Sequence, residues 1–267
     1  MKNAFLILAH KNPGQMEKFI RFLSAEEDNV FVHIDKRENE LFEKMISLFK
    51  ENKNVHFVQK RFAVYWGSYN QIKATLELIR FAKDFGGSDY FHLLSGQDLP
   101  VMNLKEINSF LTENRGTEFI ECFPLPDARW NRSGGMDRLW FYWLDGRLNR
   151  FTGYLHLFQM KTGWKRNVNK YKFYGGTNWF TLSKDFIGWM FEYLQKNPAY
   201  LKRFRGTRNA DEIFVQTLIM NSPFEKKVQS KDLRYINWND GPEYPRTLRT
   251  EDFNKIFAEK GNLFARK

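Results

Sequence analysis

Residues 5–9, Phe-Leu-Ile-Leu-Ala, form a continuous apolar run that stops at the break His10-Lys-Asn-Pro-Gly14. A short apolar run bounded by proline and glycine is typical of a buried strand. An amphipathic segment follows at 15–23, and a second apolar run, Val30–Ile34, ends at Asp35. This succession predicts a strand, a helix and a second strand.

The same alternation continues through the first hundred residues. The patterns predict a helix at 41–49, a short strand at 55–58, a helix at 68–85 whose apolar residues share one face, and a strand at 90–94. Strands that alternate with helices at this spacing predict βαβ units and a mainly parallel sheet.

Polar residues follow three of these strands directly. They are His10, Asp35 and the stretch 95–98, which ends at Asp98. Ligands of open parallel sheets bind at the carboxyl ends of the strands. We therefore expect a ligand site that includes these residues.

Residues 123–172 differ from the first part of the chain. They hold many tryptophans, arginines and lysines and show little periodicity, which predicts long loops and short helices laid over the sheet. No linker or repeat interrupts the chain. We predict one domain, 1–267.

The last hundred residues show further short elements. The sequence predicts a helix at 184–195 capped by Ser183, a helix at 213–219 and a strand at 233–238. A short helix after residue 250 is expected to be capped by Thr250.

The composition indicates an anionic partner. The formal net charge is +11 and the aromatic share is 17%, which leaves nucleic acid, anionic lipid and a phosphorylated small molecule open. Aromatic planes also suit the C–H face of a sugar. The single cysteine, Cys122, excludes an internal disulfide.

Several common kinds of site have no motif in this chain. The sequence has no Asp-x-Asp pair, no Walker pattern and no G-x-G-x-x-G, and its five histidines are scattered. Carboxylates and cations are left. Asp211-Glu212, at a predicted helix start, fits either a helix-dipole pair or a general base. Arg234 and the terminal Arg266-Lys267 could hold phosphates.

Motifs along nearly the whole chain occur in one order. They are Ala4–His10, Val32–Asp35, Trp66–Asn70, His92–Pro100, Tyr174–Trp179, Asp211–Thr217, Asn237–Pro245 and Leu263–Lys267. In this order they resemble the core-2/I-branching family of β-1,6-N-acetylglucosaminyltransferases, which also includes protein xylosyltransferases.

The resemblance implies a GT-A variant with a Rossmann-like α/β sheet, in which 1–122 is the nucleotide-binding half and 123–267 is the acceptor and catalytic half. It implies an inverting transfer from a UDP-sugar without a metal ion, in agreement with the missing Asp-x-Asp pair. By the family pattern Glu212 is the catalytic base, and Arg234 and Lys267 hold the diphosphate. The remaining candidates are His10, Asp35, Trp66, Asp98 and Arg266 for the donor, and Trp179, Asp211 and Trp238 for the acceptor or sugar.

The departures from the family leave other points open. Eukaryotic members have a membrane anchor, a stem and disulfides, and this sequence has no such features. We expect a bacterial, cytoplasmic relative, with peripheral attachment to the inner face of an anionic membrane as an open alternative. N-acetylglucosamine and xylose are both open as the sugar. The acceptor is expected to be a glycan or lipid-linked glycan, with no cofactor and no nucleic-acid partner. A non-catalytic protein that binds carbohydrate or polyanions is the rival interpretation.

Overall fold

The computed structural model describes residues 1–130, 133–238 and 245–266. Its centre is a seven-stranded sheet in the order β10-β6-β9-β4-β1-β2-β3. The strands of this sheet are β1 (Asn3–Ala9), β2 (Asn29–Ile34), β3 (Val55–Phe57), β4 (Tyr90–Ser95), β6 (Glu118–Ile120), β9 (Phe180–Ser183) and β10 (Val228–Gln229). Strands β3, β2, β1 and β4 are parallel, and β9 runs antiparallel to both of its neighbours. The mainly parallel, Rossmann-like sheet of a GT-A variant that the sequence predicts is confirmed.

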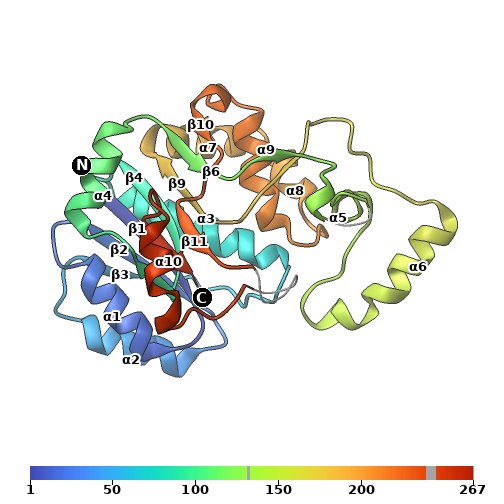
Figure 1. Ribbon diagram of the computed structural model, residues 1–267. Helices are drawn as coiled ribbons and strands as arrows, with labels where there is room; N and C mark the ends of the chain where they lie inside the picture. Colours follow the sequence, from blue (N-terminus) through green and yellow to red (C-terminus); the bar gives the residue numbers. More distant parts are fainter. Residues whose placement is uncertain (131–132, 239–244, 267) are drawn as a thin grey trace.

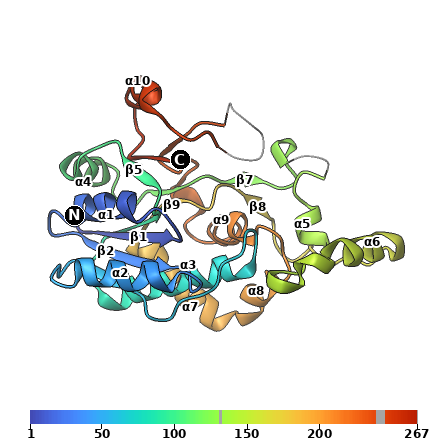
Figure 2. The same ribbon diagram turned by 90° about the horizontal axis from the view of Figure 1, so that it is seen from below.

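Both faces of the sheet are apolar and covered by helices (Figure 1). Side chains of a strand alternate between faces, so Phe5 and Ile7 of β1 join one core cluster while Ala4 and Leu6 join the other. The Phe5 cluster includes residues of α1 (Pro13–Leu23), α2 (Asn39–Phe49) and α4 (Leu104–Glu113), and the other includes α3 (Tyr69–Phe85), α7 (Lys184–Lys196) and α9 (Phe214–Met220). Figure 2 shows α1 and α4 on the side of the sheet opposite α3 and α7.

A small second sheet lies beside the carboxyl end of β4. Its order is β11 (Arg234–Ile236), β12 (Phe264–Arg266), β5 (Asp98–Pro100). β12 pairs antiparallel with β5, which brings Arg266 opposite Asp98. The end of the described chain is therefore held next to the end of β4.

The middle of the chain extends away from the parallel strands at its helix α6. It contains a two-stranded ribbon of β7 (Phe123–Pro124) and β8 (Tyr174–Gly175), the helices α5 (Asp137–Trp140) and α6 (Thr152–Thr162), and short 3-10 turns. In Figures 1 and 2, α6 lies at the far end of the molecule from the parallel strands. The expectation that 123–172 lies over the sheet is wrong for α6, which packs on neighbouring parts of its own segment, whereas Met136 and Leu139 join the core cluster that contains Ala4 and Leu6.

Local predictions in the second half held in part. Ser183 caps α7 as predicted, accepting a hydrogen bond from the Phe186 N–H. Thr250 is not a cap, because the Asp252 carboxylate accepts the Arg249 N–H instead, before α10 (Phe253–Ala258). The remaining α-helix is α8 (Pro198–Arg203). In the described part of the chain, no helix combines the length and apolar character needed to cross a membrane.

Candidate functional site

A pocket of about 430 Å³ lies at the carboxyl ends of β1, β2 and β4. Its walls come from both halves of the chain. Seven of the residues singled out from the sequence line it: His10, Asp35, Trp66, Trp179, Asp211, Glu212 and Arg266. Residues that follow the strands and residues from the second half thus line one pocket, whereas their chemical roles stay predictions.

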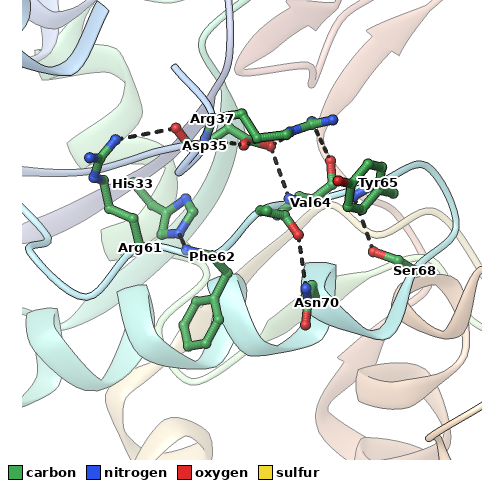
Figure 3. A network of polar contacts seen from close by, with 10 residues as sticks. His33, Asp35, Arg37, Arg61, Phe62, Val64, Tyr65, Ser68 and Asn70 are labelled. Atoms are coloured by element: carbon green, nitrogen blue, oxygen red, sulfur yellow. Dashed lines mark hydrogen bonds and ion pairs between the residues drawn. The ribbon is translucent and has the colours of Figure 1, made fainter. Parts of the chain in front are cut away.

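One wall of the pocket is the loop between β3 and α3, and Asp35 holds it (Figure 3). The Asp35 carboxylate accepts hydrogen bonds from the Val64 N–H at 3.0 Å and from the Arg37 side chain at 2.8 and 2.9 Å. Burial would raise the pKa of Asp35, but these hydrogen bonds outweigh it and the pKa is lowered. Asp35 is thus an ionised anchor for Val64 and its neighbours.

His33 supports the same loop from inside the sheet. Its Nε2 accepts a hydrogen bond from the Phe62 N–H at 3.0 Å. Burial lowers the pKa of His33 to about 4, so the ring is neutral at pH 7 and can act as an acceptor. His10, at the end of β1, also has a lowered pKa, from burial and then from the charge of Lys11.

The loop ends in a tight turn before α3. Gly67 has φ +68°, and its carbonyl accepts the Asn209 N–H at 3.1 Å. A Cβ on Gly67 would lie 2.5 Å from Asn209 Oδ1. The neighbouring Trp66 is 70% exposed at the edge of the pocket, with the Arg208 guanidinium 5.1 Å from its ring centroid.

Two adjacent carboxylates line the opposite wall. Asp211 and Glu212 lie in a 3-10 turn, Ala210–Glu212, and not in the first turn of α9 as expected. The Arg138 guanidinium donates to Glu212 Oε2 at 2.6 Å, and it also lies 3.9 Å from the Trp130 ring centroid. Among the described residues, the other Glu212 oxygen accepts no hydrogen bond, and Glu212 is one of the residues that line the pocket.

The two carboxylates differ in their surroundings. Burial, and then the negative charge of Glu212, raise the pKa of Asp211 to about 7. Glu212 instead forms an ion pair with Arg138. The pair therefore combines one carboxyl that is partly protonated at neutral pH with one that is held as an ion pair.

The third wall carries a cation. Arg266 lies flat against Trp179, with its guanidinium carbon 3.8 Å from the ring centroid. Its Nη1 is 3.9 Å from Asp98 Oδ1, beyond hydrogen-bonding distance, and has no hydrogen-bond partner in the described part of the protein. A buried donor without a partner is costly, so this guanidinium is suited to an anionic ligand in the pocket.

Two predicted donor residues lie beneath the pocket instead of lining it. Asp98 is fully buried and accepts the Ser95 N–H at 2.9 Å. Arg234 donates to the carbonyls of Leu93 and Phe180 at 2.7 and 3.2 Å, and burial lowers its pKa to about 10. Both lie close to Arg266, whose positive charge acts to lower the pKa of each of them, although burial is the larger effect and raises the pKa of Asp98.

Two further predicted residues are not part of the described pocket. Trp238 is half exposed and does not line it. Lys267 lies outside the described residues. The pocket also includes residues that sequence reasoning missed, among them Tyr65, Asn178 and Asn209. Sequence reasoning also missed Arg138, which contacts Glu212. Arg138 is 74 residues from Glu212 in the sequence, and no periodic pattern relates the two positions. The sequence feature that could have indicated Arg138 is the alternation of arginine with tryptophan in the middle segment.

The described residues contain no group of three or more His, Cys, Asp or Glu side chains that could hold a metal ion. Whether the reaction needs a metal ion stays a prediction from the sequence.

A model of the Core-2/I-branching enzymes matches residues 3–260. The chain belongs to this family. The family resemblance stated from the ordered motifs is confirmed, and the pocket gathers residues from seven of those eight motifs.

Curated relatives of this Core-2/I-branching chain include xylosyltransferases of animals. Xylosyltransferase 2 of Rattus norvegicus is 26% identical over 240 residues, which cover 88% of this chain and 26% of the relative. Xylosyltransferase 1 of Homo sapiens is 25% identical over 88% of this chain and 24% of its own length. The chain therefore spans about a quarter of the length of these relatives.

Solved structures give a weaker likeness. Mouse xyloside xylosyltransferase 1 in its apo form aligns over 100% of this chain and 98% of its own, with 12% identity and a TM-score of 0.43. The bifunctional glycosyltransferase WbbM aligns over 98% of this chain and 45% of its own, with 12% identity and a TM-score of 0.44. Both scores are too low to support a conclusion about this Core-2/I-branching chain, whose fold follows from its own strand order and register.

Proposed function

We propose that this chain is an inverting glycosyltransferase that moves a sugar from a UDP-sugar to a hydroxyl of a glycan, without a metal ion. The observation that carries the proposal is the pocket itself. It places the Asp211 and Glu212 carboxylates and the Arg266 guanidinium around one space of about 430 Å³, and Arg266 Nη1 has no hydrogen-bond partner among the described residues. Membership of the Core-2/I-branching family supports the same reaction class.

Glu212 is the proposed general base. An inverting transfer needs a single displacement, in which the base removes the proton of the acceptor hydroxyl as that oxygen attacks the anomeric carbon. Arg138 holds Glu212 Oε2 at 2.6 Å, which orients the side chain and leaves the second oxygen to take the proton. Asp211, with its raised pKa, is proposed to donate a hydrogen bond to the acceptor or the sugar.

Arg266 is the proposed partner of the diphosphate. As UDP leaves, negative charge grows on its phosphate oxygens, and a fixed guanidinium can stabilise that charge. Stacking on Trp179 at 3.8 Å fixes the plane of the guanidinium before the donor binds. Lys267 is the next residue along the chain, and a second contact from it to the diphosphate stays part of the proposal.

The sugar and the acceptor are proposed by class. The curated relatives are named as xylosyltransferases, which supports xylose, and N-acetylglucosamine is the alternative from the family description. Trp66 and Trp179 at the pocket provide apolar planes for a sugar face.

The experiment is a calorimetric titration of the protein with UDP, UDP-xylose and UDP-N-acetylglucosamine in EDTA, followed by a transfer assay. We expect one UDP-sugar to bind in EDTA. Glu212→Gln should keep donor binding and lower the transfer rate by about 10²–10⁴-fold, as expected for loss of a general base. Arg266→Met should weaken UDP binding about tenfold or more, as expected for loss of a charged hydrogen bond.

Glu225→Gln is the matched control, because Glu225 is exposed and does not line the pocket. Its rate and affinity should equal those of the parent. Binding that appears only with added divalent ions would refute metal independence. Full transfer by Glu212→Gln would refute its role as base, and donor or sugar binding without any transfer would support a non-catalytic carbohydrate-binding protein.

A further inference from the structure

The segment between Asp145 and Asp185 has an unusual charge pattern. It contains no Asp or Glu and eight Lys or Arg residues. Its first part, residues 146–166, includes the 3-10 turn Gly146–Phe151 and helix α6. We call residues 146–166 the arm, and Figures 1 and 2 show its helix at the end of the molecule away from the parallel sheet.

Burial in the arm is the reverse of that in an ordinary surface helix. The polar Gln159 is fully buried, and its side chain bonds both the N–H and the carbonyl of Tyr142 at 2.8 and 3.0 Å. The His156 ring stacks on Trp143 with centroids 5.0 Å apart. The polar side chains of α6 thus hold the helix to the protein, and its apolar side chains are left outside.

The apolar side chains are large and numerous. The exposed ones in the arm are Leu148, Phe151, Tyr154, Leu157, Phe158, Met160 and Trp164. These seven exposed side chains belong to one short segment, 146–166, and a concentration of exposed apolar side chains marks an interaction site. Exposed Lys161 and Lys165 lie beside it, so the partner must accept apolar side chains and carry negative charge.

We propose that the arm docks on the surface of an anionic lipid bilayer. Aromatic and aliphatic side chains flanked by lysine and arginine suit the boundary between headgroups and acyl chains. A second copy of the chain is the less favourable occupant, because two arms would bring basic segments without acidic residues together. α6 has 11 residues, which gives a length of roughly 16 Å; that is too short to cross a hydrocarbon core of about 30 Å, so the arm lies in the interface.

The arm adjoins the pocket described above. Asp145, at its base, accepts the Tyr69 N–H of α3 at 3.1 Å, and Arg208 lies between Trp143 and the pocket residue Trp66, 4.9 and 5.1 Å from their ring centroids. A bilayer on the arm would face the Trp66 edge of the pocket. If the proposed transfer is correct, this arrangement favours an acceptor carried by a membrane lipid.

The experiment is flotation of the full chain with vesicles, one set of pure phosphatidylcholine and one containing phosphatidylglycerol. We expect binding to the anionic set, weaker at high salt. Leu157→Gln/Phe158→Gln should reduce the bound fraction at least about tenfold by removing apolar insertion. Lys161→Gln/Lys165→Gln should weaken binding about fivefold for each lysine.

Phe253→Gln/Phe257→Gln is the matched control. These side chains of α10 are 58% and 49% exposed, against 57% and 56% for Leu157 and Phe158, but they lie outside the arm. The control should bind vesicles like the parent. UDP binding is measured on every variant and should not change, so loss of vesicle binding is separate from any failure of the proposed transferase. The proposal would be overturned if the parent does not bind anionic vesicles, or if the control variant loses as much vesicle binding as the Leu157/Phe158 variant. It would also be overturned if the chain instead forms a dimer that depends on the arm.

Discussion

Two neighbouring carboxylates in one turn can have different chemistry, and Asp211 and Glu212 illustrate how. Both side chains end in a carboxyl group. Glu212 accepts a hydrogen bond from Arg138 at 2.6 Å, whereas Asp211 is buried and lies close to the negative charge of Glu212. The prediction from the sequence could name the pair as acid–base candidates. It could not assign the ion pair, because the partner comes from a segment without periodic pattern.

The raised pKa of Asp211 predicts a pH-dependent stability. In the folded protein the pKa is about 7, against an ordinary value of 3.8. Between these values the folded state binds more protons than the unfolded state, so the free energy of unfolding falls as pH rises. The slope approaches about 1.4 kcal/mol per pH unit below the folded pKa.

Asp211→Asn removes this titration. As pH rises from 5 to 8, the free energy of unfolding of Asp211→Asn, measured in urea, should increase relative to that of the parent. The difference between the two proteins should become constant above the folded pKa of Asp211. Asp127→Asn is the control, since the Asp127 pKa is lowered through hydrogen bonds with Arg129 and contributes no slope of this sign. A gap that is constant across this pH range would contradict the raised pKa.

At the scale of elements, the loop from β3 to α3 shows how an apolar sheet builds a polar wall. Val58 N–H still pairs with β2, and beyond it the chain is held by side chains: Asp35 bonds Val64, and Asn70 donates to the Ala63 carbonyl at 2.8 Å. The turn then closes at Gly67, against Asn209 of the second half. This glycine is required both by φ +68° and by the close approach of Asn209.

Gly67→Ala should therefore both destabilise the protein and weaken donor binding. The left-handed backbone costs about 1–2 kcal/mol for alanine, and the clash with Asn209 adds to that cost and shifts the wall at Trp66. Gly163→Ala is the matched control, because Gly163 is left-handed with φ +67° and has no atom within 4 Å of an added Cβ. Urea unfolding and UDP titration of both variants separate the two effects. Equal affinity of both variants for UDP would rule out the turn as a determinant of the pocket.

The elements that sequence reasoning found are those whose apolar pattern is decided locally. β1, β2, β4 and α3 were predicted within a few residues because burial on both faces, or on one stripe, appears in the sequence itself. β5 and β12 were not predicted, because each has three residues and exists through pairing with the other. The expectation that 123–172 lies over the sheet failed at α6, because the sequence shows the aromatic density of the segment but not which side chains are buried, and the buried side chain of this helix is Gln159.

At the scale of the whole molecule, the last strand ties the second half of the chain to the first. Phe264 of β12 is fully buried, with ring centroids 6.3 Å from both Phe5 of β1 and Phe19 of α1. Arg266 follows two residues later in the same strand and lines the pocket. The stability of the half at 1–122 and the position of Arg266, the proposed partner of the diphosphate, therefore depend on one short strand. We infer that 1–267 unfolds as a single cooperative unit.

Phe264→Ala tests this interpretation. Loss of a buried phenylalanine costs about 3–5 kcal/mol, and in a chain of this size we expect the melting temperature to fall by roughly 10 °C in one calorimetric transition. UDP affinity should fall as well, even far below the melting temperature, because β12 loses the packing that fixes Arg266. Phe257→Ala, at a half-exposed phenylalanine of α10, should leave both values nearly unchanged. The interpretation would be contradicted by two separate calorimetric transitions, only one of which has a lower melting temperature in Phe264→Ala. The halves at 1–122 and 123–267 would then unfold independently, and β12 would stabilise only the half whose melting temperature fell.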